Sequence, residues 1–139
     1  MKKKIFISTG EVSGDLHGSL LAKELFEESR KQSIDLEIYG LGGQKMKESG
    51  VEIIKDTTPI SAIGIWEAIP LVLPMMKIQK QFLKALIAKS PNCLILIDYM
   101  GPNISIGREL KKKKINMPIY YYIAPQEWAW RVGNNSTTD

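Results

Sequence analysis

Two hydrophobic patterns alternate along the chain. Short apolar runs predict strands over residues 4–8, 36–39, 51–54, 93–97 and 119–123. Apolar residues three and four positions apart predict helices over residues 14–31, 44–49, 75–89 and 103–114. Strands that alternate with helices in this way are typical of an α/β domain with a parallel sheet.

The run from Cys93 to Ile97 is apolar at every position. A strand with this pattern is covered on both faces, which requires helices on both sides of the sheet. We therefore expect a Rossmann-like, doubly wound, mostly parallel sheet with the first strand at its centre. The length of 139 residues suits one domain, and 44% hydrophobic and 24% charged residues are typical of a globular protein.

Charge and composition exclude several classes of function. The net charge of +4 is small, and no aromatic residues interleave with the two lysine runs, so a nucleic-acid partner is not expected. The single Cys93 allows no internal disulfide and is expected to be a buried structural thiol in a reducing compartment. One cysteine and one histidine, His17, cannot build a common zinc site, so we expect no metal and no cofactor.

The segment from residue 59 to 76 is almost entirely apolar but is interrupted by glycine and proline. It is too broken to span a bilayer, and the N-terminus does not resemble a signal peptide, so we expect a cytoplasmic protein. One interpretation is a helix covering the core, with a lead-in bent by proline. The other is an apolar surface for acyl chains or a membrane face. Its contact residues would be Ile65, Trp66, Ile69 and Leu73.

Candidate chemistry follows three of the predicted strands. Residues 10–15, Gly-Glu-Val-Ser-Gly-Asp, connect the first strand to a helix that Ser13 or Asp15 could cap. Asp98 and Glu127 follow the fourth and fifth strands, and all of these loops should meet Glu11 at one rim of the sheet. A capped turn without a ligand remains the alternative for residues 10–15.

Two common nucleotide motifs do not fit. Gly40 and Gly42 begin a pattern like the dinucleotide fingerprint, but Lys45 occupies the position of its third glycine. The loop also follows the second strand, and a ribose-binding acid at the usual spacing is missing, which excludes NAD. The Gly-Lys-Ser/Thr signature of a phosphate-binding P-loop does not occur either.

The loops that follow the predicted strands, taken together with other short segments, resemble those of the lipid-A-disaccharide synthase family. The matching segments are residues 10–15, 40–43 with Met46 and Gly50, 63–67, 97–98, 103 and 122–131. The Gly-Glu-x-Ser-Gly-Asp and Trp-Ala-Trp segments are the specific ones. The chain departs from the usual family pattern at residues 99–103 and 124–127, which affects the contacts with the acceptor.

The resemblance implies that residues 1–139 are the N-terminal, acceptor-side domain of a GT-B glycosyltransferase, without the C-terminal nucleotide-sugar domain. Such a fragment is expected to fold but to be inactive alone. The complete enzyme would join two acylated glucosamines in lipid A and lipopolysaccharide biosynthesis. It would transfer 2,3-diacylglucosamine from UDP to 2,3-diacylglucosamine 1-phosphate with inversion, as a hexosyltransferase at the surface of the inner membrane, and a homo-oligomer is possible.

An inverting transfer needs a base on the acceptor hydroxyl. Asp98 is the expected base, and Glu11 is the expected orienting or alternative carboxylate. The expected substrate-binding residues are Ser13, Gly14, Asp15, Asn103 and Trp128. Two other functions stay open: a non-catalytic Rossmann-like domain that binds a phosphate-bearing small molecule, and a membrane-docking module.

Overall fold

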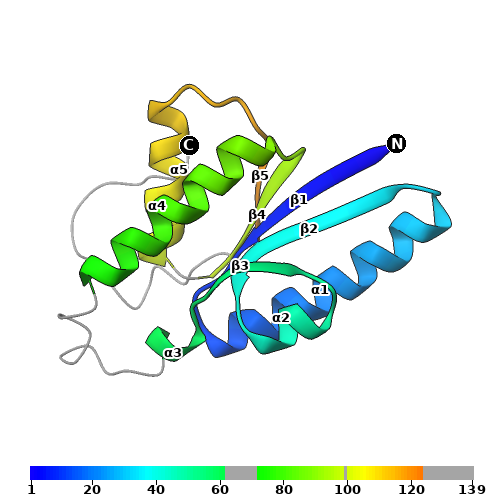
Figure 1. Ribbon diagram of the computed structural model, residues 1–139, viewed down its shortest axis with the longest axis horizontal. Helices are drawn as coiled ribbons and strands as arrows, with labels where there is room; N and C mark the ends of the chain where they lie inside the picture. The colour runs from blue at the N-terminus through cyan, green and yellow to red at the C-terminus, as the bar shows by residue number, and fades with distance from the viewer. Residues whose placement is uncertain (62–71, 99, 124–139) are drawn as a thin grey trace.

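The structure is a computed structural model that describes residues 1–61, 72–98 and 100–123 (Figure 1). The strands are β1 (Lys2–Ser8), β2 (Asp35–Gly42), β3 (Glu52–Asp56), β4 (Cys93–Ile97) and β5 (Ile119–Ile123). The helices are α1 (Val12–Lys31), α2 (Gln44–Glu48), α3 (Thr58–Ser61), α4 (Val72–Lys89) and α5 (Met100–Lys112). Strands and helices alternate from β1 to β5, apart from the successive helices α3 and α4.

The strands form one sheet in the order β3-β2-β1-β4-β5, and every pairing is parallel. This confirms the Rossmann-like fold and the central place of β1. The chain moves outward from β1 to β3, then crosses back to continue on the other side of β1. The strand order therefore reverses between β1 and β4, and α/β sheets commonly bind ligands at such a reversal, beyond the carboxyl ends of the strands.

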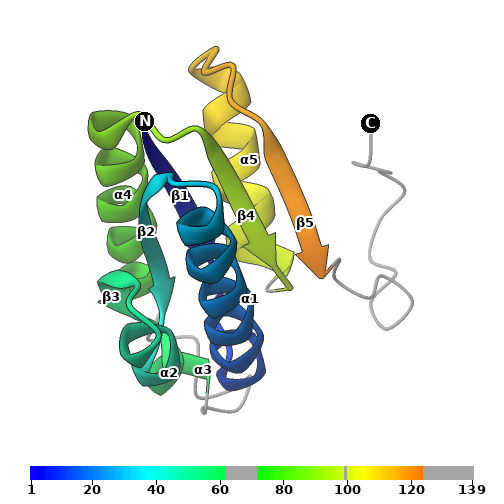
Figure 2. The same cartoon turned by 90° about the vertical axis from the view of Figure 1, so that its right-hand side faces the viewer.

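Helices cover both faces of the sheet, with α1 and α2 on one face and α4 and α5 on the other (Figures 1 and 2). The side chains of β4 alternate between the two cores: Leu94 and Leu96 pack toward α4 and α5, whereas Ile95 and Ile97 pack toward α1 and α2. This confirms the prediction made from the apolar run of β4. Phe82 from α4 is fully buried in the first core.

Two helices begin earlier than the sequence predicts. The expected starts were about Met75 and Asn103, but α4 begins at Val72 and α5 at Met100. Pro74 and Pro102 consequently lie in first turns, where the missing proline N–H would have had no intrahelical partner. Proline in the first turn is compatible with a helix, so Pro74 and Pro102 do not mark where α4 and α5 begin.

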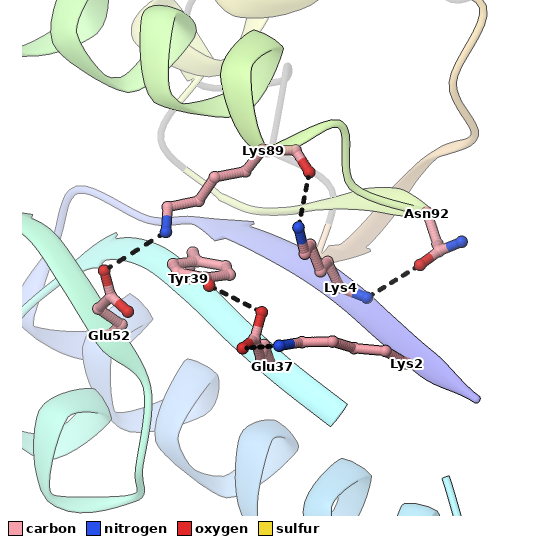
Figure 3. Close-up of polar contacts among 7 residues, drawn as sticks. All are labelled: Lys2, Lys4, Glu37, Tyr39, Glu52, Lys89 and Asn92. Carbon is pink, nitrogen blue, oxygen red and sulfur yellow. Dashed lines mark hydrogen bonds and ion pairs between the residues drawn. The ribbon is translucent and has the colours of Figure 1, made fainter. Parts of the chain in front are cut away.

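Polar contacts connect residues toward the amino-terminal end of the sheet (Figure 3). Lys2 Nζ lies 2.7 Å from Glu37 Oε1, and the Tyr39 hydroxyl donates to Glu37 Oε2 at 2.8 Å. The hydrogen bond with Lys2 is the main reason that the pKa of Glu37 lies below its ordinary value, followed by the one with Tyr39. Lys89 is the last residue of α4. Its Nζ lies 3.8 Å from the centroid of the Tyr39 ring and 3.7 Å from Glu52 Oε1. These contacts connect α4 to β2 and β3.

Within the described ranges, no helix is both long enough and apolar enough to cross a membrane.

Cys93 is half-buried, and burial raises the pKa of its thiol. A raised pKa keeps the thiol protonated and unreactive at neutral pH, as expected for a structural cysteine.

Candidate functional site at the carboxyl ends of β1 and β4

The junction between β1 and α1 is built by close packing of small residues. Thr9 is buried at the end of β1, and its N–H donates to the Leu41 carbonyl oxygen at 3.1 Å. Gly14, in the first turn of α1, lies so close that a Cβ there would be 1.7 Å from Thr9 Oγ1. The absence of a side chain at Gly14 therefore allows α1 to start directly against the end of the strand.

The first turn of α1 presents polar groups at the edge of the sheet. Glu11 is the N-cap residue, with an extended backbone and an exposed side chain that caps nothing within the described chain. Ser13 is exposed as well. Backbone N–H groups in the first turn of a helix have no intrahelical acceptor, and they carry the positive end of the helix dipole. This end of α1 can therefore receive an anion or a sugar hydroxyl.

The sequence analysis offers Asp15 as a possible cap of α1. In the structure the N-cap of α1 is Glu11, and Asp15 caps α2 instead. Its Oδ1 accepts from the N–H groups of Gly43 at 2.7 Å and Met46 at 3.1 Å, and its Oδ2 accepts from Lys45 at 3.0 Å. The side chain is only 4% exposed. The carboxylate of Asp15, which the sequence analysis expects to contact substrate, is therefore occupied by hydrogen bonds to the start of α2.

The junction between β4 and α5 is held by hydrogen bonds. Asn103 is fully buried, and its Nδ2 donates to the carbonyl oxygen of Asp98 at 2.5 Å. Its Oδ1 accepts from the Ser8 hydroxyl of β1 at 2.7 Å. Asn103 was also expected to contact substrate, but in this structure its carboxamide faces the protein interior. Asp98 itself is partly exposed at the end of β4.

The two junctions are neighbours in space. β1 and β4 pair in parallel with Ser8 opposite Leu96, so their carboxyl ends are level. Figure 2 shows α1 starting at the same end of the sheet where the β4 and β5 arrowheads lie. Glu11 follows β1 by three residues and Asp98 follows β4 directly. The sequence correctly predicted that these two acidic residues belong to one edge of the sheet.

Several of the other predicted residues are not described by the structure. Glu127, Trp128, Ile65, Trp66 and Ile69 lie outside the described residues, and for Leu73 the structure describes only the backbone, in the first turn of α4. His17 is exposed on α1. In the described part of the chain, no group of three or more His, Cys, Asp and Glu side chains could hold a metal ion.

Sequence reasoning missed Thr9 and Ser8. Thr9 Oγ1 is a buried hydroxyl without a hydrogen-bond partner among the described residues. Its backbone oxygen accepts from the Thr57 hydroxyl at 3.0 Å. The only signal in the sequence was a pair of polar residues ending an apolar strand, which does not distinguish a structural role from a functional one.

An open groove of about 570 Å³ lies elsewhere, at the other end of α1. Lys23, Phe26, Arg30 and Gly50 contribute to its lining. None of the site residues predicted from the sequence lines this groove. The two acidic residues predicted as catalytic, Glu11 and Asp98, therefore lie at the carboxyl ends of the strands and not in this groove.

Comparison with known proteins gives a consistent result over almost the whole chain. A family model described as "Lipid-A-disaccharide synthetase" matches residues 5–137. A "Lipid-A-disaccharide synthase" from Prochlorococcus marinus (strain MIT 9313) is 50% identical over 135 residues, which cover 97% of this chain and 34% of the relative. Relatives of the same name from Gloeothece citriformis and Synechocystis are each 46% identical, over 98% and 91% of this chain. The chain spans about a third of the length of these relatives (34%, 35% and 32%).

Proposed function

Because this chain belongs to the lipid-A-disaccharide synthase family, we propose that it supplies the acceptor side of an inverting glycosyltransferase of lipid A biosynthesis. The reaction transfers 2,3-diacylglucosamine from UDP to the 6-hydroxyl of 2,3-diacylglucosamine 1-phosphate and releases UDP. Residues 1–139 form the N-terminal domain in this proposal, and a second domain binds the nucleotide sugar. The fragment alone is inactive, because it lacks that donor site.

One observation carries the proposal: two carboxylate residues, Glu11 and Asp98, follow adjacent parallel strands at the point where the strand order reverses. Asp98 is the base that removes the proton from the acceptor hydroxyl as its oxygen attacks the anomeric carbon of the donor. Glu11 orients the acceptor through its hydroxyl groups. Glu11 is exposed and Asp98 is partly exposed, which leaves both residues accessible to a substrate.

The start of α1 is the proposed site of the acceptor phosphate. Its first-turn N–H groups and the exposed Ser13 hydroxyl offer hydrogen-bond donors to an anion. Gly14 contributes through its packing, because the missing side chain lets the first turn of α1 lie directly against Thr9. Asp15 and Asn103 act indirectly in this proposal, by holding the two junctions in place.

A transfer assay tests the proposed role of Asp98. The assay uses a hybrid protein, in which this chain replaces the matching third of the Prochlorococcus marinus relative. Asp98→Asn should lower kcat by about 100-fold or more, since general-base catalysis contributes about 10²–10⁴-fold. Asp35→Asn is the matched control, because Asp35 is an exposed aspartate at the opposite end of the sheet. An Asp98→Asn hybrid that transfers at the unsubstituted rate, or a folded hybrid without transferase activity, would contradict the proposal.

Peripheral attachment to the inner membrane is a separate part of the proposal, carried by the apolar sequence of residues 59–76. The chain should float with liposomes that contain anionic lipid. The double substitution Trp66→Ser and Leu73→Ser should lower the bound fraction by about tenfold, because it removes two large apolar side chains. Unchanged flotation of the double variant would contradict a docking role for this segment.

A further inference from the structure

Asp98 has an unusual backbone conformation for a residue at the end of a strand. Its φ of 45° lies in the left-handed region, which non-glycine residues seldom adopt. The other described non-glycine residues with positive φ are Ser33, Ser90 and Lys114. Those three follow the ends of α1, α4 and α5, where a left-handed residue is a common way to terminate a helix. Asp98 has no such local reason.

Hydrogen bonds on both sides of Asp98 hold this conformation. Its N–H donates to the carbonyl oxygen of Ile123 at the end of β5, at 2.8 Å. Its carbonyl oxygen accepts from Asn103 Nδ2. Both peptide groups that flank the Asp98 Cα are therefore fixed, and their orientations determine the direction in which the carboxylate leaves the backbone.

Asn103 is itself held rigidly. Its side chain is fully buried, its Oδ1 accepts from the Ser8 hydroxyl, and its Nδ2 also lies 3.4 Å from the Ile97 carbonyl oxygen. The hydroxyl donor on one side and the carbonyl acceptors on the other define which end of the carboxamide is oxygen and which is nitrogen. Asn103 thus connects the ends of β1 and β4 through one side chain.

We propose that Asn103 is a positioning residue that holds Asp98 in its left-handed conformation and so aims the carboxylate at the acceptor. The proposal rests on the proposed function, in which Asp98 is the base. Strained backbone that the surrounding structure holds in place is found preferentially at functional sites. A buried carboxamide suits this task because it donates and accepts at once without introducing charge.

NMR spectroscopy of the 139-residue chain tests the positioning directly. In Asn103→Ala, the carbon shifts of Asp98 should move from left-handed toward extended values. Exchange of the Asp98 amide should accelerate by about tenfold or more as the junction opens locally. Asn92→Ala is the matched control, because Asn92 Oδ1 accepts from the Lys4 N–H at 2.9 Å at the opposite end of β4 (Figure 3). Its effect on Asp98 should stay within about twofold.

A second variant keeps the test decisive if Asn103→Ala does not fold. The double substitution Ser8→Ala and Asn103→Leu removes both side chains of the Ser8–Asn103 hydrogen bond and retains most of the buried volume, so it avoids the cavity that Asn103→Ala leaves. It should shift Asp98 in the same way as Asn103→Ala. A folded variant of either kind with unchanged Asp98 carbon shifts and unchanged amide exchange would overturn the proposal.

Kinetics of the hybrid protein separate this proposal from the function on which it rests. Asn103→Ala should lower kcat by about tenfold or more and change KM by less than about threefold, as expected for a misdirected base. Loss of activity in Asp98→Asn with normal kcat in Asn103→Ala would refute the positioning role alone. Normal activity in Asp98→Asn would refute the proposed function, whatever the NMR spectra show.

Discussion

The two strand-to-helix junctions at the proposed site meet at one edge of the sheet but are constructed differently. The β1–α1 junction depends on a missing side chain, since Gly14 packs directly against Thr9. The β4–α5 junction depends on polar contacts, since the Asn103 side chain donates to the Asp98 carbonyl oxygen and accepts from the Ser8 hydroxyl. The first junction should therefore be sensitive to added volume, and the second to lost hydrogen bonds.

This difference matches the groups that each junction presents. Close packing at β1–α1 places the start of α1 directly against the carboxyl end of β1, which is useful for a ligand that is recognised by its anionic charge. Hydrogen bonding at β4–α5 leaves one carboxylate in a fixed direction, which is useful for proton transfer. One junction is thus suited to binding, and the other to chemistry.

The largest effect on stability is expected at Asp15, which connects the β1–α1 junction to α2. Asp15→Ala removes the acceptor of three N–H groups, two of them in buried hydrogen bonds. The free energy of unfolding should fall by about 2–4 kcal/mol, from the loss of a helix cap and the unpaired donors left behind. Urea unfolding of the chain measures this value, with Asp35→Ala as the exposed control, which should stay within about 0.5 kcal/mol.

A smaller loss is expected when volume is added at the β1–α1 junction. Gly14→Ala should lower the free energy of unfolding by about 1–3 kcal/mol, because the new methyl group meets the Thr9 side chain. Thr9→Ala in the same chain should recover part of the loss, since it removes the hydroxyl that clashes. Costs that simply add in a double-mutant cycle would show that the two residues are not in contact.

The same substitution in the interior of α5 should have the opposite sign. Gly107 lies in α5, and a Cβ there would meet nothing within 4 Å. Gly107→Ala should therefore raise the free energy of unfolding by about 0.5–1 kcal/mol, through helix propensity alone. Destabilisation by Gly107→Ala would mean that the interior of α5 is as tightly packed as the start of α1, which would remove the contrast between Gly107 and Gly14.

The smallest effect is expected far from both junctions, at Glu37. Because the pKa of the Glu37 carboxyl is lower in the folded chain than its ordinary value, its contribution to stability is present above that ordinary value. The contribution is lost as the pH falls through the lower, folded-state pKa. Unfolding midpoints of the unsubstituted chain and Glu37→Gln, measured from about pH 6 to about pH 3, should therefore differ most at the upper end. A difference that grows with acid would contradict this sign.

The fold was predictable because its information is local. Three features follow from neighbouring residues alone. They are the strand pattern of Cys93–Ile97, the position of Gly50 at φ 98° after α2, and the apolar stripe of Ile78, Phe82 and Leu86. The helix starts were less predictable, since Pro102 is compatible with a first turn as well as with a loop.

The long-range polar contacts were not predictable from spacing. Asp15 reaches Gly43 across 28 positions, and Ser8 reaches Asn103 across 95. A hint existed at α2, which follows Gly43 without a Ser, Thr, Asp or Asn as its own N-cap. A helix start without a local cap needs an acceptor from elsewhere, and Asp15 provides it. Asn103 offered no comparable hint, because a polar residue near a helix start usually faces solvent or ligand.

The central claim is that the two junctions act as one acceptor site. The most direct measurement is an amide NMR titration of the 139-residue chain with glucosamine 1-phosphate, a soluble form of the acceptor head group. We expect the amides of residues 10–14 and of Asp98 to shift together, with the same apparent affinity. Shifts confined to one junction, or to the groove lined by Lys23, Arg30 and Gly50, would contradict it.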